Sequence, residues 1–406
     1  AHDTAGIAVA SMLACAEAGA DVIDAAIDSM SGLTSQPSMG AIVSSLEQME
    51  LGTGISHDSI QRLNLYWSEV RQLYQCFEQN VKASDSSVFD HEMPGGQYTN
   101  LMFQSQQLGL GSQWSEIKHA YMEANMLCGD IVKVTPSSKV VGDLAQFMVA
   151  NKLSARDVEE HASTLDFPVS VVEFFQGFLG TPPGGFPEPL RTHIIRNKER
   201  VDTRRGASLP PLDFDKIKSD LTVKYRRPMS ECDAVSWAMY PKVFEEFQAF
   251  IEEFGDLSRM PTRFFLGKPK AGEEMHIPIE DGKLLIVKLL GLGPFHEATG
   301  MRDVLFELNS SPRSISVKDL SASVEEVHHE KATSEPGSVG SPLAGVVVEL
   351  KVKEGDAVKP GDAMFVMSAM KMETIVSAQI AGKVTRVAVK QNDSLSQNDL
   401  LCEITP

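Results

Sequence analysis

The sequence predicts a multidomain α/β protein in which the end of a (β/α)8 barrel, a helical region, a small α+β segment and an all-β flattened barrel follow one another. Three observations carry this prediction. The chain opens on an apolar helical run followed by a glycine and a β-branched run, helical periodicity dominates from residue 57, and an internal repeat fills the C-terminal end. A length of 406 residues fits about two to four domains.

Residues 1–56 predict an α-to-β unit of a parallel sheet. A helix capped near Asp3 or Thr4 would cover the apolar residues 7–18, and the β-branched pair Val22-Ile23 follows a glycine turn. A polar loop and a second helix complete this part. It looks like the closing end of a (β/α)8 barrel whose earlier strands are missing, and in such barrels the loops after the strands carry the chemistry.

Residues 57–238 are predicted to be mainly helical, with two polar loops of unusual composition at Met93–Asn100 and Val134–Lys139. The second loop gathers hydroxyls and a lysine at a predicted helix start, where Ser137 would be the cap. Such a helix start suits an anionic ligand, because backbone N–H groups and the helix dipole point at it. A purely structural helix start is the alternative interpretation.

Residues 239–320 are predicted to mix helix and strand. This segment should hold an amphipathic helix over 243–254 and strands over 275–279, 283–290, 304–309 and 313–317. Residues 321–338, rich in Ser, Glu, Pro and Gly, are predicted to form a flexible linker. About fourteen flexible residues of such a linker span roughly 20 Å on average.

Residues 339–406 contain two copies of one pattern. Ala344 and Ala381 begin the copies 37 residues apart, and the same offset relates Gly355 to Asn392. Both copies alternate apolar and polar residues like half-buried strands. Asparagine is the residue that next best tolerates a positive φ after glycine, so the turns should match as well. Two such units related by a pseudo-two-fold axis would close into a small flattened barrel.

The connection between the copies carries Lys371 between two methionines, where a hairpin tip would project into solvent. A lysine on a rigid tip suits the attachment of a prosthetic group through an amide, and a plain solvated lysine is the alternative. The tip resembles the biotinyl domain of biotin-dependent carboxylases, whose Ala-Met-Lys-Met signature stands at Ala369–Met372. Lipoyl domains share the fold but usually have an acidic residue before the lysine. The resemblance implies biotin on Lys371.

The charge balance excludes some partners. Lys and Arg number 37 against 55 Asp and Glu, a net charge of -18, which argues against nucleic acid or an anionic membrane surface as a partner. Five scattered cysteines without CxxC spacing indicate a reducing compartment. No apolar run reaches the length of a transmembrane helix. The chain begins in the middle of a pattern without an initiator methionine, so we expect a fragment of a longer protein.

Four stretches resemble the pyruvate carboxylase family and occur in that family's order. They are His2-Asp3-Thr4, Met93–Asn100, Val134–Phe147 and Gly206–Asp213. The resemblance covers essentially the whole chain and corresponds to the C-terminal third of the full enzyme. It implies transfer of a carboxyl group from carboxybiotin on Lys371 to pyruvate, giving oxaloacetate for anaplerosis and gluconeogenesis. It also implies a helical funnel on the carboxyltransferase barrel, formed by residues 57–238.

The resemblance also implies roles for individual residues. His2 would be the second histidine of a metal-binding pair for zinc or manganese, with the other ligands upstream of the chain. Thr135 would be the catalytic threonine, because a hydroxyl both donates and accepts a proton. Gln97 would lie in the substrate pocket, and Ser138 and Lys139 would contact biotin or substrate.

Further cofactors and partners follow from the same resemblance. ATP and Mg would bind in an absent N-terminal biotin carboxylase domain, which would also be a partner. Acetyl-CoA would bind the tetramerisation and allosteric segment 239–320, the enzyme would be a homotetramer, and a biotin protein ligase would modify it. The compartment would be the mitochondrial matrix or the cytoplasm. The fragment alone should be inactive in the overall reaction. A non-catalytic biotin carrier and assembly module, or an oxaloacetate decarboxylase or transcarboxylase chain, are the alternatives.

Overall fold

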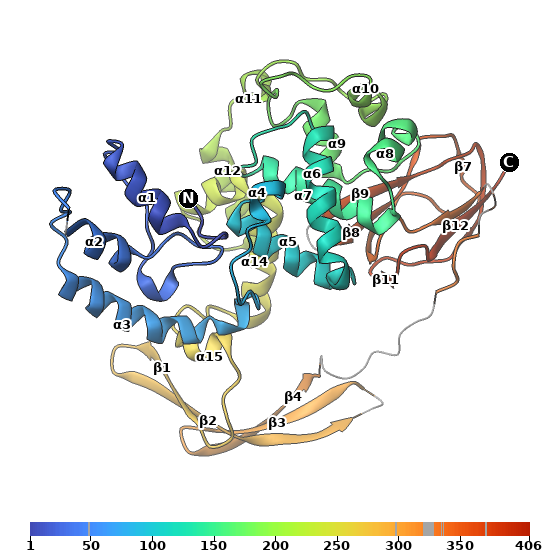
Figure 1. The fold of residues 1–406 in the computed structure, drawn as a ribbon. Helices are drawn as coiled ribbons and strands as arrows, with labels where there is room; N and C mark the ends of the chain where they lie inside the picture. Colours follow the sequence, from blue (N-terminus) through green and yellow to red (C-terminus); the bar gives the residue numbers. More distant parts are fainter. Residues whose placement is uncertain (48, 297–298, 320–328, 334, 336, 370–371) are drawn as a thin grey trace. The chain divides into compact units, whose positions relative to one another are not determined.

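The computed structural model describes residues 1–406 with the exception of 48, 297–298, 320–328, 334, 336 and 370–371 (Figure 1). The chain forms two compact units. The first unit comprises Ala1–Arg71, Phe77–Ala207 and Val327–Pro406, and the second comprises Gln72–Cys76 and Ser208–Glu326. Among the described residues, none of the helices is long and apolar enough to cross a bilayer.

The helices of the first unit follow the predicted order. They are α1 (Ala8–Glu17), α2 (Met39–Glu47), α3 (His57–Leu73), α4 (Val88–His91), α5 (Gly95–Gln107), α6 (Trp114–Leu127), α7 (Ser137–Asn151), α8 (Ala155–His161), α9 (Val169–Gln176) and α10 (Leu190–Ile195), with the short α11 (Arg205–Ser208) at the boundary. The predicted cap of α1 near Asp3 or Thr4 is not formed, because Ile7 occupies the N-cap and no side chain caps it, although the Asp3 carboxylate accepts the N–H of Ala8 at 2.8 Å.

The strand expected around Val22 is not formed in the described part of residues 1–56. A single parallel bridge between Ala26 and Ser38 stands in its place, and Val22 is 82% exposed. A parallel strand is normally buried between neighbouring strands, and the described residues among the first 56 contribute that one bridge alone. The barrel assignment therefore has no support in the local structure of this part.

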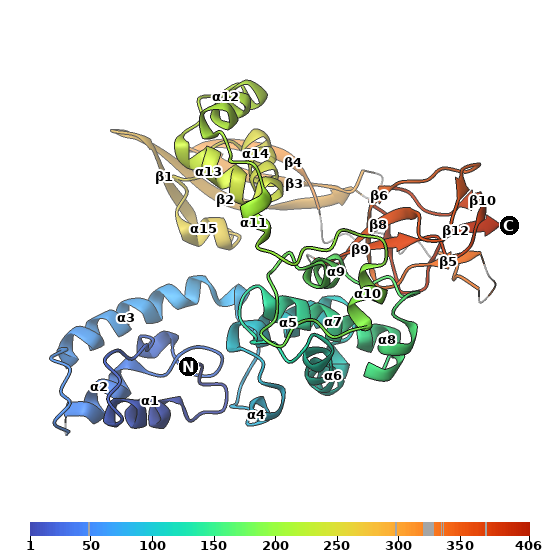
Figure 2. The same cartoon turned by 90° about the horizontal axis from the view of Figure 1, so that it is seen from above.

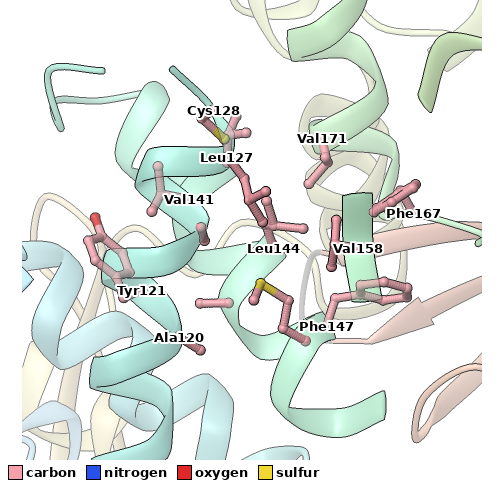
Figure 3. Packing of buried hydrophobic residues seen from close by; sticks show 14 of the residues in the cluster. Ala120, Tyr121, Leu127, Cys128, Val141, Leu144, Phe147, Val158, Phe167 and Val171 are labelled. Carbon is pink, nitrogen blue, oxygen red and sulfur yellow. The ribbon is translucent and has the colours of Figure 1, made fainter. Parts of the chain in front are cut away.

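The core of the helical part lies around α6, α7 and α9. Helix α7 is the central element, since nearly every residue from 138 to 148 is buried and Lys139 is the exception. Figure 3 shows Leu144 and Phe147 of α7 directed toward α8 and the loop that precedes α9, and the rings of Phe147 and Phe167 lie 5.4 Å apart. Such close packing fixes α7 rigidly and with it the loop before the helix.

The second unit combines a helical bundle with one antiparallel sheet. Its elements are α12 (Phe214–Tyr225), α13 (Glu231–Met239), α14 (Pro241–Phe254), α15 (Thr262–Leu266), β1 (Glu274–Glu280), β2 (Lys283–His296), β3 (Met301–Leu308) and β4 (Ser311–Lys318). Figure 2 shows α12, α13 and α14 grouped together, around the buried side chains of Leu221, Met229 and Phe244. The strands pair in sequence order, so the predicted helix and the four predicted strands are confirmed.

The repeat folds into a C-terminal barrel, here residues 338–405. Its strands are β5 (Ser338–Gly340), β6 (Gly345–Leu350), β7 (Ala357–Val358), β8 (Ala363–Ala369), β9 (Met372–Ser377), β10 (Gly382–Val387), β11 (Ser394–Leu395) and β12 (Leu400–Thr405). They form two sheets, ordered β5-β12-β10-β7 and β11-β6-β8-β9. The two copies exchange short strands, since β7 of the first copy pairs with β10 and β11 of the second pairs with β6. The pseudo-two-fold barrel is therefore confirmed.

The matching turns of the repeat are also confirmed. Gly355 and Gly361 have φ of 97° and 91°, and the equivalent Asn392 and Asn398 have φ of 72° and 63°. Each copy therefore places a residue that tolerates the left-handed region where the turn requires it.

The predicted linker is shorter than residues 321–338. The N–H of Leu400 donates to the carbonyl of Glu330 at 2.7 Å, and the Lys331 ammonium lies 2.7 Å from the buried carboxylate of Asp399. The chain therefore packs against the C-terminal barrel from residue 330 onward, whereas residues 320–328 lie outside the described part.

Candidate functional site

The loop that carries Thr135 runs directly into the central helix α7. Thr135 is exposed, while Ser138, one residue into the helix, is only 5% exposed. The prediction that Ser137 caps α7 is wrong, because Pro136 occupies the N-cap and no side chain caps it. The Ser137 hydroxyl instead accepts the N–H of Val134 at 3.1 Å and so closes the loop before the helix. The backbone N–H groups of the first turn are left without a side-chain cap.

The sequence predicted a loop over residues 93–100. This prediction is wrong, because α5 already begins at Gly95. Gln97 therefore stands in the first turn of α5. A Cβ atom placed on Gly142 of α7 would lie 2.5 Å from Nε2 of Gln97. The absence of a side chain at Gly142 thus lets Gln97 pack against α7, one turn away from Ser138 and Lys139. Gln97 thus lies against the helix that carries Ser138 and Lys139.

His2 lies against the other side of the same turn of α5. A Cβ on Gly95 would lie 2.8 Å from the His2 ring and 2.3 Å from the carbonyl oxygen of Thr34. Partial burial of the ring lowers the pKa of His2, which favours the neutral imidazole that binds metals. The described residues contain no group of three or more His, Cys, Asp or Glu that could hold an ion. Within the part of the chain that the structure describes, His2 could therefore supply at most one ligand of an incomplete set.

A carboxylate that the sequence did not single out connects these elements. The N–H of Asp85 donates to the carbonyl of Thr4 at 2.7 Å, and its carboxylate accepts from Tyr98 at 3.1 Å and from Lys118 at 2.9 Å. Burial would raise the pKa of Asp85, but hydrogen bonds from Ser87 and Lys118 outweigh it and hold that pKa far below its usual range. Asp85 therefore ties the segment containing His2 to α5 and α6. No sequence pattern distinguishes it from the other loop acids.

The tip of the C-terminal barrel is a tight hairpin. The last residue of β8, Ala369, pairs with the first residue of β9, Met372, so two residues form the connection. Ala369 and Met372 are at most 5% exposed and pack with Leu343 and with Leu108, just after α5. Lys371 itself lies outside the described residues. Ala369 and Met372, which stand on either side of residues 370–371, are buried.

The C-terminal barrel lies next to the helical part, with β9 near α9 (Figure 1), and backbone and polar groups make the contact. Pro168, just before α9, forms an antiparallel bridge with Thr374 of β9, and the N–H of Ser377 donates to the Asp166 carboxylate at 3.1 Å. Burial raises the pKa of Asp166. At the other end, Gln397 donates to the carbonyl of Ala150 at 2.6 Å. These contacts place the hairpin strands beside α9 within the first unit.

Asp143 is the second carboxylate that the sequence did not single out. It is 2% exposed in the middle of α7, where its Oδ2 atom contacts the ammonium group of Lys139 and accepts a hydrogen bond from Ser170 at 2.5 Å. Its four-residue spacing from Lys139 was visible in the sequence, but its burial and its second partner, Ser170 on α9, were not.

Comparison with known families matches both parts of the chain. A family described as a conserved carboxylase domain matches residues 88–288, and a family described as biotin-requiring enzymes matches residues 337–404. The first match includes Gln97, Thr135, Ser138 and Lys139, and the second includes the hairpin tip.

Whole-sequence comparison finds pyruvate carboxylases. The chain is 53% identical over 405 residues to that of Aspergillus terreus, covering 100% of this chain and 34% of that protein. It is 47% identical over 406 residues to the mitochondrial pyruvate carboxylase of Mus musculus, covering 99% of this chain and 34% of that protein. The chain thus spans about a third of the length of the curated relatives it matches.

Solved structures agree in fold. The carboxyl transferase domain of Rhizobium etli pyruvate carboxylase superposes with a TM-score of 0.71 at 42% identity, covering 79% of this chain and 54% of that one. The complete multifunctional enzyme of the same organism superposes with a TM-score of 0.69 at 39% identity, covering 99% of this chain and 37% of that one.

Proposed function

We propose that this chain, which belongs to the pyruvate carboxylase family and corresponds to its C-terminal part, performs the carboxyl-transfer half of the pyruvate carboxylase reaction. A carboxyl group carried on biotin at Lys371 is passed to pyruvate, and oxaloacetate is formed. The observation that carries this proposal is the close approach of Gln97 to Gly142 of α7, one turn after Ser138 and Lys139, within the same unit as the C-terminal barrel.

Thr135 is the residue we assign to proton transfer. Carboxylation of pyruvate requires a proton to leave its methyl group and a proton to arrive on biotin, and one hydroxyl can accept the first and donate the second. Thr135 is exposed at the start of α7, so both reactants can reach its hydroxyl. The positive end of the α7 dipole lies at this first turn and favours the negative charge of the pyruvate carboxylate.

Three neighbours bind and orient the reactants. Gln97 offers an amide that can donate to an oxygen atom of the substrate, Ser138 offers a hydroxyl, and Lys139 offers a positive charge to a carboxylate or to carboxybiotin. The Rhizobium etli carboxyl transferase domain, 42% identical to this chain, has been solved with pyruvate and biocytin. That complex supports the same two reactants for this chain.

His2 is proposed as one ligand of a divalent metal ion, zinc or manganese. When bound, such an ion would polarise the pyruvate carbonyl and favour removal of the methyl proton. The remaining ligands would come from outside this chain. The pocket that lies beside His2 is lined also by Thr4, Glu92 and Met93, so the histidine borders open space and not a closed core.

The division of the chain into domains is proposed as the sequence predicts it. Residues 1–56 would end the carboxyltransferase barrel, 57–238 form its helical funnel, 239–320 belong to the tetramerisation and acetyl-CoA segment, and 339–406 carry biotin. ATP and Mg would act in a separate biotin carboxylase domain. A biotin protein ligase would attach biotin, and the protein would act as a tetramer in the matrix or the cytoplasm.

The proposal is tested with Thr135→Ala in a full-length carboxylase that contains this sequence. Oxaloacetate formation should fall by about 10² to 10⁴, the usual contribution of general acid–base catalysis. Bicarbonate-dependent ATP cleavage should persist, because that step takes place elsewhere. Retention of near-normal oxaloacetate formation would remove Thr135 from the mechanism and favour a non-catalytic carrier module.

Biotin attachment is tested separately with Lys371→Arg. The wild type and the variant are expressed with a biotin ligase and probed with avidin. Only the wild type should bind, because arginine cannot form the amide. Avidin binding by the variant would show that another lysine carries the biotin.

A further inference from the structure

The charge arrangement at the start of α7 is unfavourable without a partner. Lys139 stands in the first turn, where the helix dipole repels a cation. The acid that follows it, Asp143, comes four residues later, which is the weaker order for a helical ion pair. Helix electrostatics alone therefore does not account for this pair.

Burial of Asp143 is also costly. Its neighbours along α7, from Val140 to Met148, are apolar, glycine or, at Gln146, a neutral amide bonded to Ser105 at 3.0 Å. Burial raises the pKa of Asp143, and the Lys139 ammonium and the Ser170 hydroxyl act against that rise. A buried ion pair often contributes less to stability than apolar residues of similar size. A contribution to function would explain why a carboxylate occupies this position.

The geometry points to Asp143 as a positioning residue, which holds the ammonium group of Lys139 in one place beside the reactants and is itself fixed by the hydroxyl of Ser170. This inference rests on the proposed function, since Lys139 is there the cation that meets a carboxylate. A lysine side chain has four rotatable bonds and loses much entropy when it is held. A buried carboxylate that is bonded on both sides confines it before substrate arrives.

The position of Ser170 adds a connection to the carrier. Ser170 lies in the first turn of α9, two residues after Pro168, whose backbone bridges to Thr374 of β9. The same short segment therefore contacts the strand that leads away from the biotin hairpin and the carboxylate that holds Lys139. The start of α9 therefore takes part both in seating the C-terminal barrel and in placing Lys139.

The first test is Asp143→Asn in the full-length carboxylase, with kcat and KM for pyruvate measured. Asparagine keeps the shape and removes the charge. Loss of a charged hydrogen-bond partner should lower kcat/KM by about 10- to 100-fold, with bicarbonate-dependent ATP cleavage unchanged. Asp157→Asn is the matched control, because Asp157 also accepts a serine hydroxyl, that of Ser154 at 2.6 Å, but caps α8 away from Lys139.

The second test reads the Lys139 amine directly and does not depend on activity. Acetic anhydride labelling followed by mass spectrometry measures how readily Lys139 reacts compared with the other lysines. Lys139 is 41% exposed, so the reagent can reach it. Asp143→Asn should raise its labelling severalfold and leave the other lysines unchanged. A purely structural role for Asp143 would not change Lys139 selectively.

Ser170 provides a second pair of variants in case Asp143→Asn fails to fold. Ser170→Ala should raise Lys139 labelling and lower kcat/KM, and Ser170→Thr, which keeps the hydroxyl, should restore both. The inference is overturned if either Lys139 labelling or kcat/KM for pyruvate stays within twofold of wild type in Asp143→Asn. If Asp143→Asn does not fold, the same criterion is applied to Ser170→Ala. Loss of transfer in Thr135→Ala with no effect at Asp143 would leave the proposed function standing and remove only this inference.

Discussion

The contact between α5 and the segment containing His2 depends on the missing side chain of Gly95. A Cβ atom there would lie 2.3 Å from the carbonyl oxygen of Thr34 and 2.8 Å from the His2 ring, whereas a Cβ on the next residue, Gly96, meets nothing within 4 Å. Both glycines belong to the first turn of α5. Gly95→Ala and Gly96→Ala are therefore a matched pair that differs only in the space available.

The magnitudes follow from these distances. A carbon–oxygen contact requires about 3.3 Å, so α5 must retreat by roughly 1 Å in Gly95→Ala. Overpacking of this kind costs about 1–3 kcal/mol, and the gain in helix propensity offsets at most about 1 kcal/mol of it. Gly96→Ala receives only that gain. Because Gln97 follows on the same turn, the retreat should also lower kcat/KM for pyruvate, by up to about 10²-fold.

The assay combines three measurements on the full-length enzyme. Oxaloacetate formation gives kcat/KM, bicarbonate-dependent ATP cleavage serves as the internal reference, and hydrogen exchange of the α5 amides reports local stability. Gly95→Ala should lose transfer activity and α5 protection together, and Gly96→Ala should keep both. Equal behaviour of the two variants would refute the tight contact between Gly95, Thr34 and His2.

Three further outcomes are expected. Tyr121 is fully buried and its hydroxyl has no partner among the described residues, so Tyr121→Phe should stabilise the fold by about 1 kcal/mol. Tyr98→Phe loses hydrogen bonds to Asp85 and Trp114 and should destabilise the fold by a similar amount in the same denaturation assay. Gly142→Ala should displace the Gln97 amide, 2.5 Å from the new Cβ, and raise KM for pyruvate with little change in stability. The pKa of Asp85 is lower in the folded protein than in the unfolded chain. The ionised carboxylate therefore stabilises the fold fully above the unfolded pKa of about 4, and this stabilisation is lost as the pH falls through the folded pKa. Asp85→Asn should flatten the acid side of the curve of stability against pH, and an unchanged slope would contradict this.

The site was predictable where a residue type and its neighbours along the chain define the chemistry. Thr135, Ser138 and Lys139 precede or begin one helix, so their closeness follows from the sequence. Their proximity to Gln97 does not, because it depends on how α5 packs against Gly142, 45 residues further on. The interpretation of residues 93–100 as a loop was wrong for a related reason. Two adjacent glycines disfavour a helix locally, but the first of them is required for close contact with Thr34.

The sequence by itself determined the C-terminal barrel and the antiparallel sheet of the second unit. Alternation, a constant offset of 37 residues between Gly355 and Asn392, and turn residues that tolerate positive φ are local or periodic properties, so they can be read along the chain. Only the tertiary structure decided the roles of Asp85 and Asp143. Each carboxylate meets partners from distant segments, Tyr98 and Lys118 for the first and Ser170 for the second. The energy of a buried charge depends on those partners and on the exclusion of water, and neither is a property of the neighbouring sequence.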